Sequence, residues 1–276
     1  MLVCGVNERD KPLNLRITNN RIKKCTGDAI VIKNFKNFKK ILIKRNEVTE
    51  TKGNGLTLLS LEQGVSNVEV RDNKIDSNKG NGIYICDAIC EVADCHLIHN
   101  ASKGIYIAKG KSNKLASIIK NCTIRSNLGS GIGLATGNTR LTINSCKIVK
   151  NKEYGIELDS TELEGNSFNF SARSMDGSCF AVRDKKKAVV IRHGEISDNM
   201  KGGIYLDLKC NVLIYEASVK NNGDAAILIE NNKGTIEYSE RTLKRKMIQG
   251  GVKKKHKEIN IYSGKKSKAC GVCVIL

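Results

Sequence analysis

Four charged residues recur at a near-constant spacing in the second half of the chain. Asp159, Arg183, Asp207 and Glu230 follow one another at intervals of 23 or 24 residues. If each interval is one structural repeat, the four side chains lie on four successive repeats. Carboxylates in such a row could act as general acid and base or bind a divalent ion. No pair of adjacent aspartates and no histidine joins the row, so a surface row of alternating charges is the favoured interpretation.

A second group has the residue types that bind soft metals. Zinc needs four ligands that converge in a tetrahedron, and the spacing of these cysteines is not that of a zinc knuckle. Cys95 also shares its place in the repeat described below with Cys122 and Cys146. We therefore predict small buried thiols, with no metal and no cofactor. The group consists of Cys86, Cys90, Cys95, His96 and His99.

Tyr84, Tyr106 and Tyr205 each stand between two apolar residues of a short alternating segment. Alternation places them on the outer face of a strand, and Tyr84 should stack on Tyr106 in the neighbouring repeat. Exposed rings of this kind form platforms for sugars or peptides. Ordinary packing between strands is the simpler interpretation.

The chain has a net charge of +19, and nearly half of it lies at the carboxyl end. Residues 233–276 contain 12 Lys and Arg against three acids, a net charge of +9. We treat 1–232 and 233–276 as two regions, the second a basic cap and tail. Such an excess predicts an anionic partner, either a membrane surface or a nucleic acid. Nucleic acid is disfavoured, because only Tyr238 and Tyr262 are interleaved with the basic residues and no known motif is present.

The last four residues are Cys273, two aliphatic residues and Leu276, which is the pattern for prenylation of the cysteine, with Leu favouring geranylgeranyl. Cys270 is a second candidate, for a palmitoyl group. One lipid chain needs a basic patch or a second chain for stable anchoring. The chain is expected to lie in the cytoplasm of a eukaryotic cell, anchored to a membrane, because no signal peptide and no apolar segment of about 18 residues is found. The lysines expected to contact the membrane are Lys253, Lys254, Lys255, Lys257, Lys265, Lys266 and Lys268.

The elements that position these residues come from an internal repeat of 22 to 27 residues. A Gly or Ala precedes a short apolar segment in each copy, and the segment at Cys179 is a degenerate copy. We count nine copies, and the small residues are expected where the backbone turns sharply. The small residues before the segments are Ala29, Gly55, Gly82, Gly104, Gly131, Gly155, Gly203 and Ala226.

Two further positions of each copy hold amides or small residues. The first comes two residues before an apolar residue and holds Asn20, Asn46, Asn73, Cys95, Cys122, Cys146, Asn166, Gly194 and Ala217. The second lies five residues later and holds Cys25, Thr51, Asn78, Asn100, Asn127, Asn151, Ser171, Asn199 and Asn222. Stacked asparagines can bond to one another and satisfy polar groups at the turns.

Short strands at this spacing leave no room for a crossover helix, so each strand must pair with the equivalent strand of the next copy. The sequence therefore predicts an all-β protein, a right-handed single-stranded parallel β-helix of about nine coils. Its ladders resemble those of the right-handed β-helix repeat family, the pectin-lyase-like superfamily, over roughly residues 15–232. The resemblance implies either sugar-cleaving enzymes or non-catalytic modules such as the β-helical part of F-box proteins.

Motifs of the family's polygalacturonases are mostly missing. The segment at Arg21, Ile22 and Lys23 matches a substrate-binding tripeptide, and Arg192, His193 and Gly194 come nearest to another motif. The favoured hypothesis is a non-catalytic scaffold whose exposed sheet face binds another protein. A polysaccharide lyase or glycoside hydrolase that uses exposed acids is the alternative. The 11 scattered cysteines predict a reducing compartment with free thiols.

Overall fold

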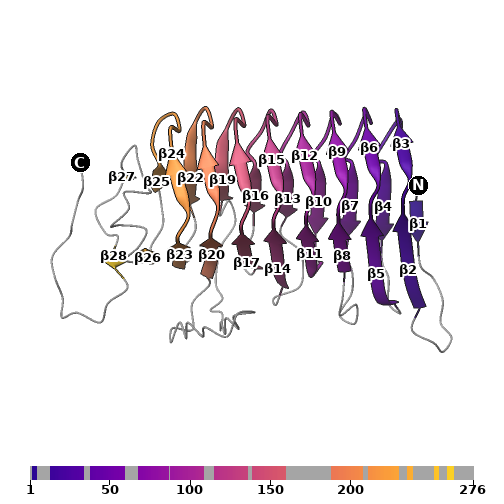
Figure 1. Cartoon of the computed structure of the whole chain (residues 1–276), viewed down its shortest axis with the longest axis horizontal. Helices are drawn as coiled ribbons and strands as arrows, with labels where there is room; N and C mark the ends of the chain where they lie inside the picture. The colour runs from indigo at the N-terminus through magenta and orange to yellow at the C-terminus, as the bar shows by residue number, and fades with distance from the viewer. Residues whose placement is uncertain are drawn as a thin grey trace.

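A computed structural model describes most of the repeat region and three strands beyond it. The described residues are 2–4, 13–33, 38–59, 68–86, 88–108, 115–135, 139–159, 188–207, 211–229, 235–238, 252–254 and 260–263. They contain strands and turns and no helix. The strands form three parallel sheets that run along a single rod, with β1 and β28 towards opposite ends (Figure 1). The predicted parallel β-helix is confirmed.

Sheet A contains ten strands. They are β1 (Leu2–Cys4), β4 (Ile30–Lys33), β7 (Leu56–Leu59), β10 (Ile83–Cys86), β13 (Ile105–Ala108), β16 (Ile132–Ala135), β19 (Tyr154–Asp159), β22 (Gly202–Asp207), β25 (Ile227–Ile229) and β27 (Val252–Lys254).

Sheet B also contains ten strands. They are β2 (Leu13–Thr18), β5 (Phe38–Lys44), β8 (Val68–Arg71), β11 (Cys90–Ala93), β14 (Leu115–Lys120), β17 (Thr139–Asn144), β20 (Ala188–Arg192), β23 (Asn211–Tyr215), β26 (Thr235–Tyr238) and β28 (Asn260–Ser263).

Sheet C contains eight strands of three residues each. They are β3 (Arg21–Lys23), β6 (Glu47–Thr49), β9 (Lys74–Asp76), β12 (His96–Ile98), β15 (Thr123–Arg125), β18 (Lys147–Val149), β21 (Glu195–Ser197) and β24 (Ser218–Lys220). A coil visits sheets B, C and A in that order. Eight described coils have all three strands, and β26, β27 and β28 extend sheets A and B beyond the eighth coil.

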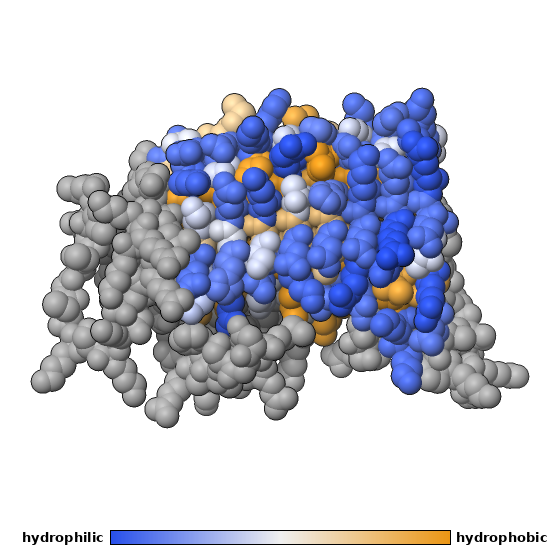
Figure 2. Space-filling view, viewed as in Figure 1, coloured by the Kyte–Doolittle hydropathy of each residue, from blue (hydrophilic) through white to orange (hydrophobic). Residues whose placement is uncertain are grey.

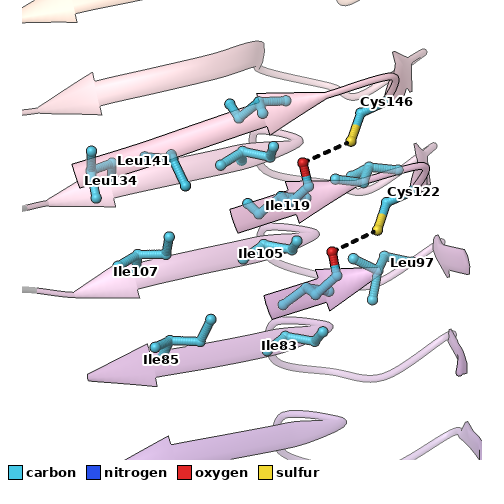
Figure 3. Packing of buried hydrophobic residues seen from close by; sticks show 14 of the residues in the cluster. Ile83, Ile85, Leu97, Ile105, Ile107, Ile119, Cys122, Leu134, Leu141 and Cys146 are labelled. Carbon is cyan, nitrogen blue, oxygen red and sulfur yellow. Dashed lines mark hydrogen bonds between the residues drawn. The ribbon is translucent and has the colours of Figure 1, made fainter. Parts of the chain in front are cut away.

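The core follows from the alternation of the strands. In β10, Ile83 and Ile85 are buried while Tyr84 and Cys86 are half-buried, and the first three residues of β13 repeat the pattern in register. The inward Ile, Val and Leu side chains of the three sheets form one continuous cluster along the rod. Figure 3 shows how Ile83, Ile105 and their neighbours stack from coil to coil.

The two predicted ladders line two of the turns. Asn100 donates from its backbone N and its Nδ2 to Asn127 Oδ1, both at 3.0 Å, and Asn127 Nδ2 donates to Asn151 Oδ1 at 3.0 Å. The same bonds join Asn78, Asn199 and Asn222 to the row. In the other ladder, Asn20, Asn46 and Asn73 are bonded in the same way. These bonds confirm the predicted stacking of amides.

Gly55, Gly82, Gly104 and Gly131 lie at a bend before the strands of sheet A, as predicted, but none of them has a left-handed φ. The left-handed turns are made by non-glycine residues that directly precede the ladder positions, for example Asn121 (φ 53°) and Ser126 (φ 55°). Gly104 instead allows two coils to approach closely. A Cβ at Gly104 would lie 2.7 Å from the Gly131 carbonyl oxygen and 2.4 Å from Ile124 Cγ2. The recurrence of small residues along this row therefore reflects a packing requirement rather than a requirement of φ.

The number of coils differs from the prediction by one. β19 pairs directly with β22, and β18 with β21, so no coil lies between them. The expected copy at Cys179, with Asn166 and Ser171, falls in residues 160–187, which lie outside the described residues. The spacing of 48 residues from Gly155 to Gly203 equals two periods of 24, and this coincidence made the segment look like a coil.

Candidate functional site

The predicted charge row is interrupted because that coil is missing from the stack. β19 and β22 are neighbouring strands, and their register pairs Asp159 with Asp207. Arg183 and Glu230 lie outside the described residues. The expectation of four successive coils with Arg183 between the aspartates is therefore wrong. Two acids instead hold matched positions on neighbouring strands, about 4.8 Å apart along the rod.

A row of five matched positions crosses the outside of sheet A beside these aspartates. The register aligns one residue from each of five neighbouring strands. We call this row the outer face of sheet A, and it consists of Tyr84, Tyr106, Gly133, Glu157 and Tyr205.

Aromatic pairs stand at both ends of the outer face of sheet A. The Tyr84 and Tyr106 ring centroids are 5.6 Å apart at an interplanar angle of 56°, which confirms the predicted contact. Tyr205 stacks on Tyr154 instead, at 4.8 Å and 21°. The sequence did not predict Tyr154, because it precedes the alternating segment. Gly202, its register partner, leaves room for the ring, since a Cβ there would lie 3.1 Å from Tyr154 Cδ1.

Between the aromatic pairs, a lysine side chain crosses the sheet over Gly133. A Cβ at Gly133 would lie 2.4 Å from Lys103 Cδ, so the lysine stem occupies the space that a side chain would fill. Lys103 Nζ is 2.8 Å from Glu157 Oε2 and 5.6 Å from the centroid of the Tyr106 ring. The ring face and the carboxylate both favour the ammonium at this position.

The carboxylates beside Lys103 already form hydrogen bonds and ion pairs. Ser130 is buried, and its hydroxyl donates to Glu157 Oε2 at 2.7 Å. Glu153 Oε1 accepts from Lys201 Nζ at 3.1 Å, and this hydrogen bond, with the charge of Glu153, raises the pKa of Lys201. Lys201 Nζ in turn lies 5.8 Å from the Tyr154 ring. Such an arrangement is suited to binding polar and aromatic groups.

A third polar ladder, not predicted from the sequence, runs along the turn that leads into sheet A. Asp28 Oδ1 accepts from Asn54 N at 2.7 Å, Asn54 Oδ1 accepts from Asn81 N at 2.7 Å, and Asn81 Oδ1 accepts from Lys103 N at 3.1 Å. The signal was present in the residue before each small position, which is polar in five successive copies. The ladder fixes the backbone from which Lys103 reaches over Gly133.

The stacked cysteines lie in the core as predicted. Cys95, Cys122 and Cys146 are each 2% exposed or less. The Cys122 thiol is 3.2 Å from the Lys120 carbonyl oxygen and the Cys146 thiol 3.4 Å from that of Asn144, and further contacts reach the preceding coil (Figure 3). Burial raises the pKa of the nearby Cys90 to about 12, which keeps it a neutral thiol.

The two histidines of the same group lie on the surface near sheet C. His99 Nδ1 is 3.2 Å from Asp76 Oδ1, and His96 is exposed on β12. Within the described ranges, no three or more His, Cys, Asp or Glu side chains are grouped so that they could hold a metal ion.

The two segments compared with polygalacturonase motifs lie away from the aspartate pair. Arg21 and Lys23 are on β3 of sheet C in the first coil, whereas Asp159 and Asp207 are on sheet A. His193 lies 3.3 Å from Glu216 through Nδ1 and packs edge-on against Tyr215, with ring centroids 5.4 Å apart. The structure does not bring these residues together with the aspartates.

Most of the predicted membrane-binding residues lie outside the described residues. Lys253 and Lys254 belong to β27 and pair in register with Leu228 and Ile229. The described part of the chain contains no helix long and apolar enough to cross a membrane. Those outside the described residues are Lys255, Lys257, Lys265, Lys266, Lys268, Cys270 and Cys273.

Three parallel sheets with stacked amides and an inward aliphatic core define a parallel β-helix protein. A family model described as "Right handed beta helix region" matches residues 5–168, more than half of the chain. The chain therefore belongs to the right-handed β-helix family. No curated protein matches the sequence. No solved structure matches it either.

Proposed function

We propose that this protein is a non-catalytic scaffold that binds another protein through the outer face of sheet A. The observation that carries the proposal is the combination on that face of two aromatic pairs with carboxylates already held in ion pairs. Aromatic side chains supply a large contact area at little entropic cost and are enriched at protein interfaces. Glu157, bonded to Lys103 and Ser130, is poorly placed to transfer protons.

A photo-crosslinking experiment tests the binding face. A photoreactive phenylalanine analogue at Tyr106 is expected to crosslink one discrete partner in cells. The same analogue at Thr123, which points outward from sheet C, is the matched control and is expected to give none. Equal crosslinking from both positions would contradict the assignment of the face.

The proposal includes a membrane anchor in residues 233–276. Where Leu276 is the carboxyl terminus of the protein in the cell, Cys273 carries a prenyl group and the lysines before it contact anionic lipid. The support is the order of the elements: a +9 segment, a second cysteine and then the prenylation pattern.

Cys273→Ser is expected to move the protein from the membrane to the soluble fraction of eukaryotic cells, because one lysine cluster without a lipid binds membranes weakly. Fractionation measures the change, and mass spectrometry of the C-terminal peptide identifies the lipid. An unmodified Cys273 together with unchanged fractionation of the variant would remove the anchor from the proposal.

The alternative function is sugar cleavage, and the register of Asp159 with Asp207 is the observation that favours it. Most glycoside hydrolases use a pair of carboxylates for catalysis. If the pair is catalytic, Asp207→Asn abolishes turnover of uronic-acid polymers in the presence of Ca²⁺. We expect no turnover by either protein, and activity that is lost in Asp207→Asn would replace the scaffold proposal.

A further inference from the structure

The positive charge of the repeat region is concentrated in its first two coils. Residues 13–59 contain 11 Lys and Arg against three acids, a net charge of +8. Residues 60–232, nearly four times as long, contain 22 against 20, a net charge of +2. The excess of positive charge in the repeat region is therefore confined to one end of the rod.

The described cations of these two coils encircle the N-terminal end of the stack. Eight are exposed and two, Lys40 and Lys44, are half-buried. The hydrophilic surface they give to that end is visible at the right of the view in Figure 2. We call this set the basic collar, and it consists of Arg16, Arg21, Lys23, Lys24, Lys33, Lys39, Lys40, Lys44, Arg45 and Lys52.

Half of the basic collar makes no ion pair with a residue that the structure describes. Arg21 pairs with Glu47, Lys40 with Glu69 and Lys44 with Asp72, at 2.9 to 3.4 Å. Lys23 and Lys24 share Glu50 at 4.0 and 3.9 Å. The other five cations make no ion pair with a described residue, and they are Arg16, Lys33, Lys39, Arg45 and Lys52.

Three of the five unpaired cations belong to sheet B or to the turn that follows it. Arg16 is on β2, Lys39 is on β5, and Arg45 follows β5 directly. β2 and β5 are neighbours in sheet B, so these side chains belong to adjacent coils. Arg45 has a left-handed backbone (φ 55°) at a turn, and its side chain is exposed. Like charges without a counterion repel one another at low ionic strength, and an anionic partner relieves the repulsion.

We propose that the sheet B side of the basic collar binds an anionic lipid surface. Binding to such a surface sums the charges of flexible cations within a Debye length and needs no shape complementarity, which suits exposed cations spread along a strand. A nucleic acid would have the same charge, but none of the side chains that the structure describes in these two coils is an aromatic ring on which bases could stack. The lipid surface is therefore the partner that fits these residues better.

The basic collar and the described strands of residues 233–276 lie at opposite ends of the stack. β2 begins sheet B and β28 ends it, with the nearly neutral coils between them (Figure 1). Together with the anchor in the proposed function, on which this orientation rests, the collar would lay the rod along the membrane rather than let it stand on its tail. The lipid-binding activity of the collar itself does not require the anchor.

Vesicle binding by the full chain with Cys273→Ser in every variant tests the collar without any lipid anchor. The vesicles contain phosphatidylcholine with or without phosphatidylserine. Arg16→Gln, Lys39→Gln and Arg45→Gln combined are expected to weaken binding to the anionic vesicles about a hundredfold at low salt, since each basic residue near the leaflet contributes a factor of about five. The parent protein is expected to show no binding to vesicles of phosphatidylcholine alone.

The control variant removes the same charge elsewhere. Lys79→Gln, Lys150→Gln and Lys152→Gln change exposed residues of later coils that make no ion pair with described residues, and are expected to weaken binding no more than severalfold. Equal losses in the two triple variants would overturn the proposal, because only net charge would then matter. Collar-dependent binding to an RNA or DNA duplex, with no binding to anionic vesicles, would also overturn it in favour of a nucleic acid. An unprenylated Cys273 in cells would remove the anchor and leave the collar result standing.

Discussion

Gly104→Ala is expected to lower the free energy of unfolding by about 3 kcal/mol, the upper part of the range for overpacked cores. The new Cβ would lie 2.4 Å from Ile124 Cγ2, 2.7 Å from the Gly131 carbonyl oxygen and 3.0 Å from Asn127 Nδ2. The Gly131 oxygen belongs to the backbone and Asn127 Nδ2 to an amide ladder. Neither can shift without breaking hydrogen bonds to the next coil. The coils must therefore separate locally, and urea denaturation followed by circular dichroism measures the loss.

Gly27→Ala is the matched control. No atom lies within 4 Å of a Cβ at Gly27, and its φ is not left-handed, so the change is expected to be neutral or slightly stabilising. Ala29 shows that the row accepts a Cβ where the next coil has smaller side chains. It holds the position equivalent to Gly104 in the first coil and is fully buried. In the coil above it, Val48 and Thr51 replace the Ile and Asn that Gly104 meets. A Gly104→Ala protein as stable as the Gly27→Ala protein would mean that the coils are not tightly stacked there.

Asn127→Ala is expected to cost about 4 kcal/mol, from several buried polar groups that lose their partners at about 1–3 kcal/mol each. Asn100 N and Asn100 Nδ2 lose their acceptor, and the Leu97 carbonyl oxygen loses its donor at 3.1 Å. Asn127 is fully buried, so water cannot replace the amide without opening the turn. The loss is measured by the same denaturation experiment as for Gly104.

Asn20→Ala gives the comparison for an exposed amide at the end of a ladder. Asn20 Nδ2 donates to Asn46 Oδ1 at 2.9 Å, but Asn20 N donates to the same oxygen and remains in the variant. The expected cost is below about 1 kcal/mol, as for an ordinary exposed hydrogen bond. Asn127→Thr should fall between the two, because Thr51 at the equivalent position bonds to Asn78 Oδ1 through its hydroxyl at 3.0 Å. Similar costs for Asn20→Ala and Asn127→Ala would show that the ladders do not depend on burial.

The architecture could be predicted from the sequence because the repeat itself encodes it. The ladder of Asn78, Asn100 and Asn127 fixes the number of residues per coil, and the alternation of Ile83, Tyr84 and Ile85 fixes which side chains face inward. With both known, the register of parallel strands has no freedom left, and the contact of Tyr84 with Tyr106 follows.

Other features depend on information that spacing does not carry. The spacing from Gly155 to Gly203 equals two periods although no strand lies between β19 and β22, so counting periods placed Arg183 between Asp159 and Asp207. Lys103 reaches Glu157 across two strands, over a glycine that the repeat pattern treats as one more small residue. The partner of a long side chain depends on which space the neighbouring coils leave unoccupied. That space is known only from the three-dimensional packing of the coils.

The amide ladders also determine the order in which the coils complete their hydrogen bonds during synthesis. In both asparagine ladders the backbone N and Nδ2 of one coil donate to the side-chain oxygen of the coil that follows it in the chain, as Asn78 does to Asn100 and Asn46 to Asn73. During synthesis, the backbone N and Nδ2 donors of each ladder turn therefore lack this acceptor until the ribosome has synthesised the next repeat of about 24 residues. The nascent protein would grow as a rod whose newest rim is always incomplete, and each arriving coil completes the one before it.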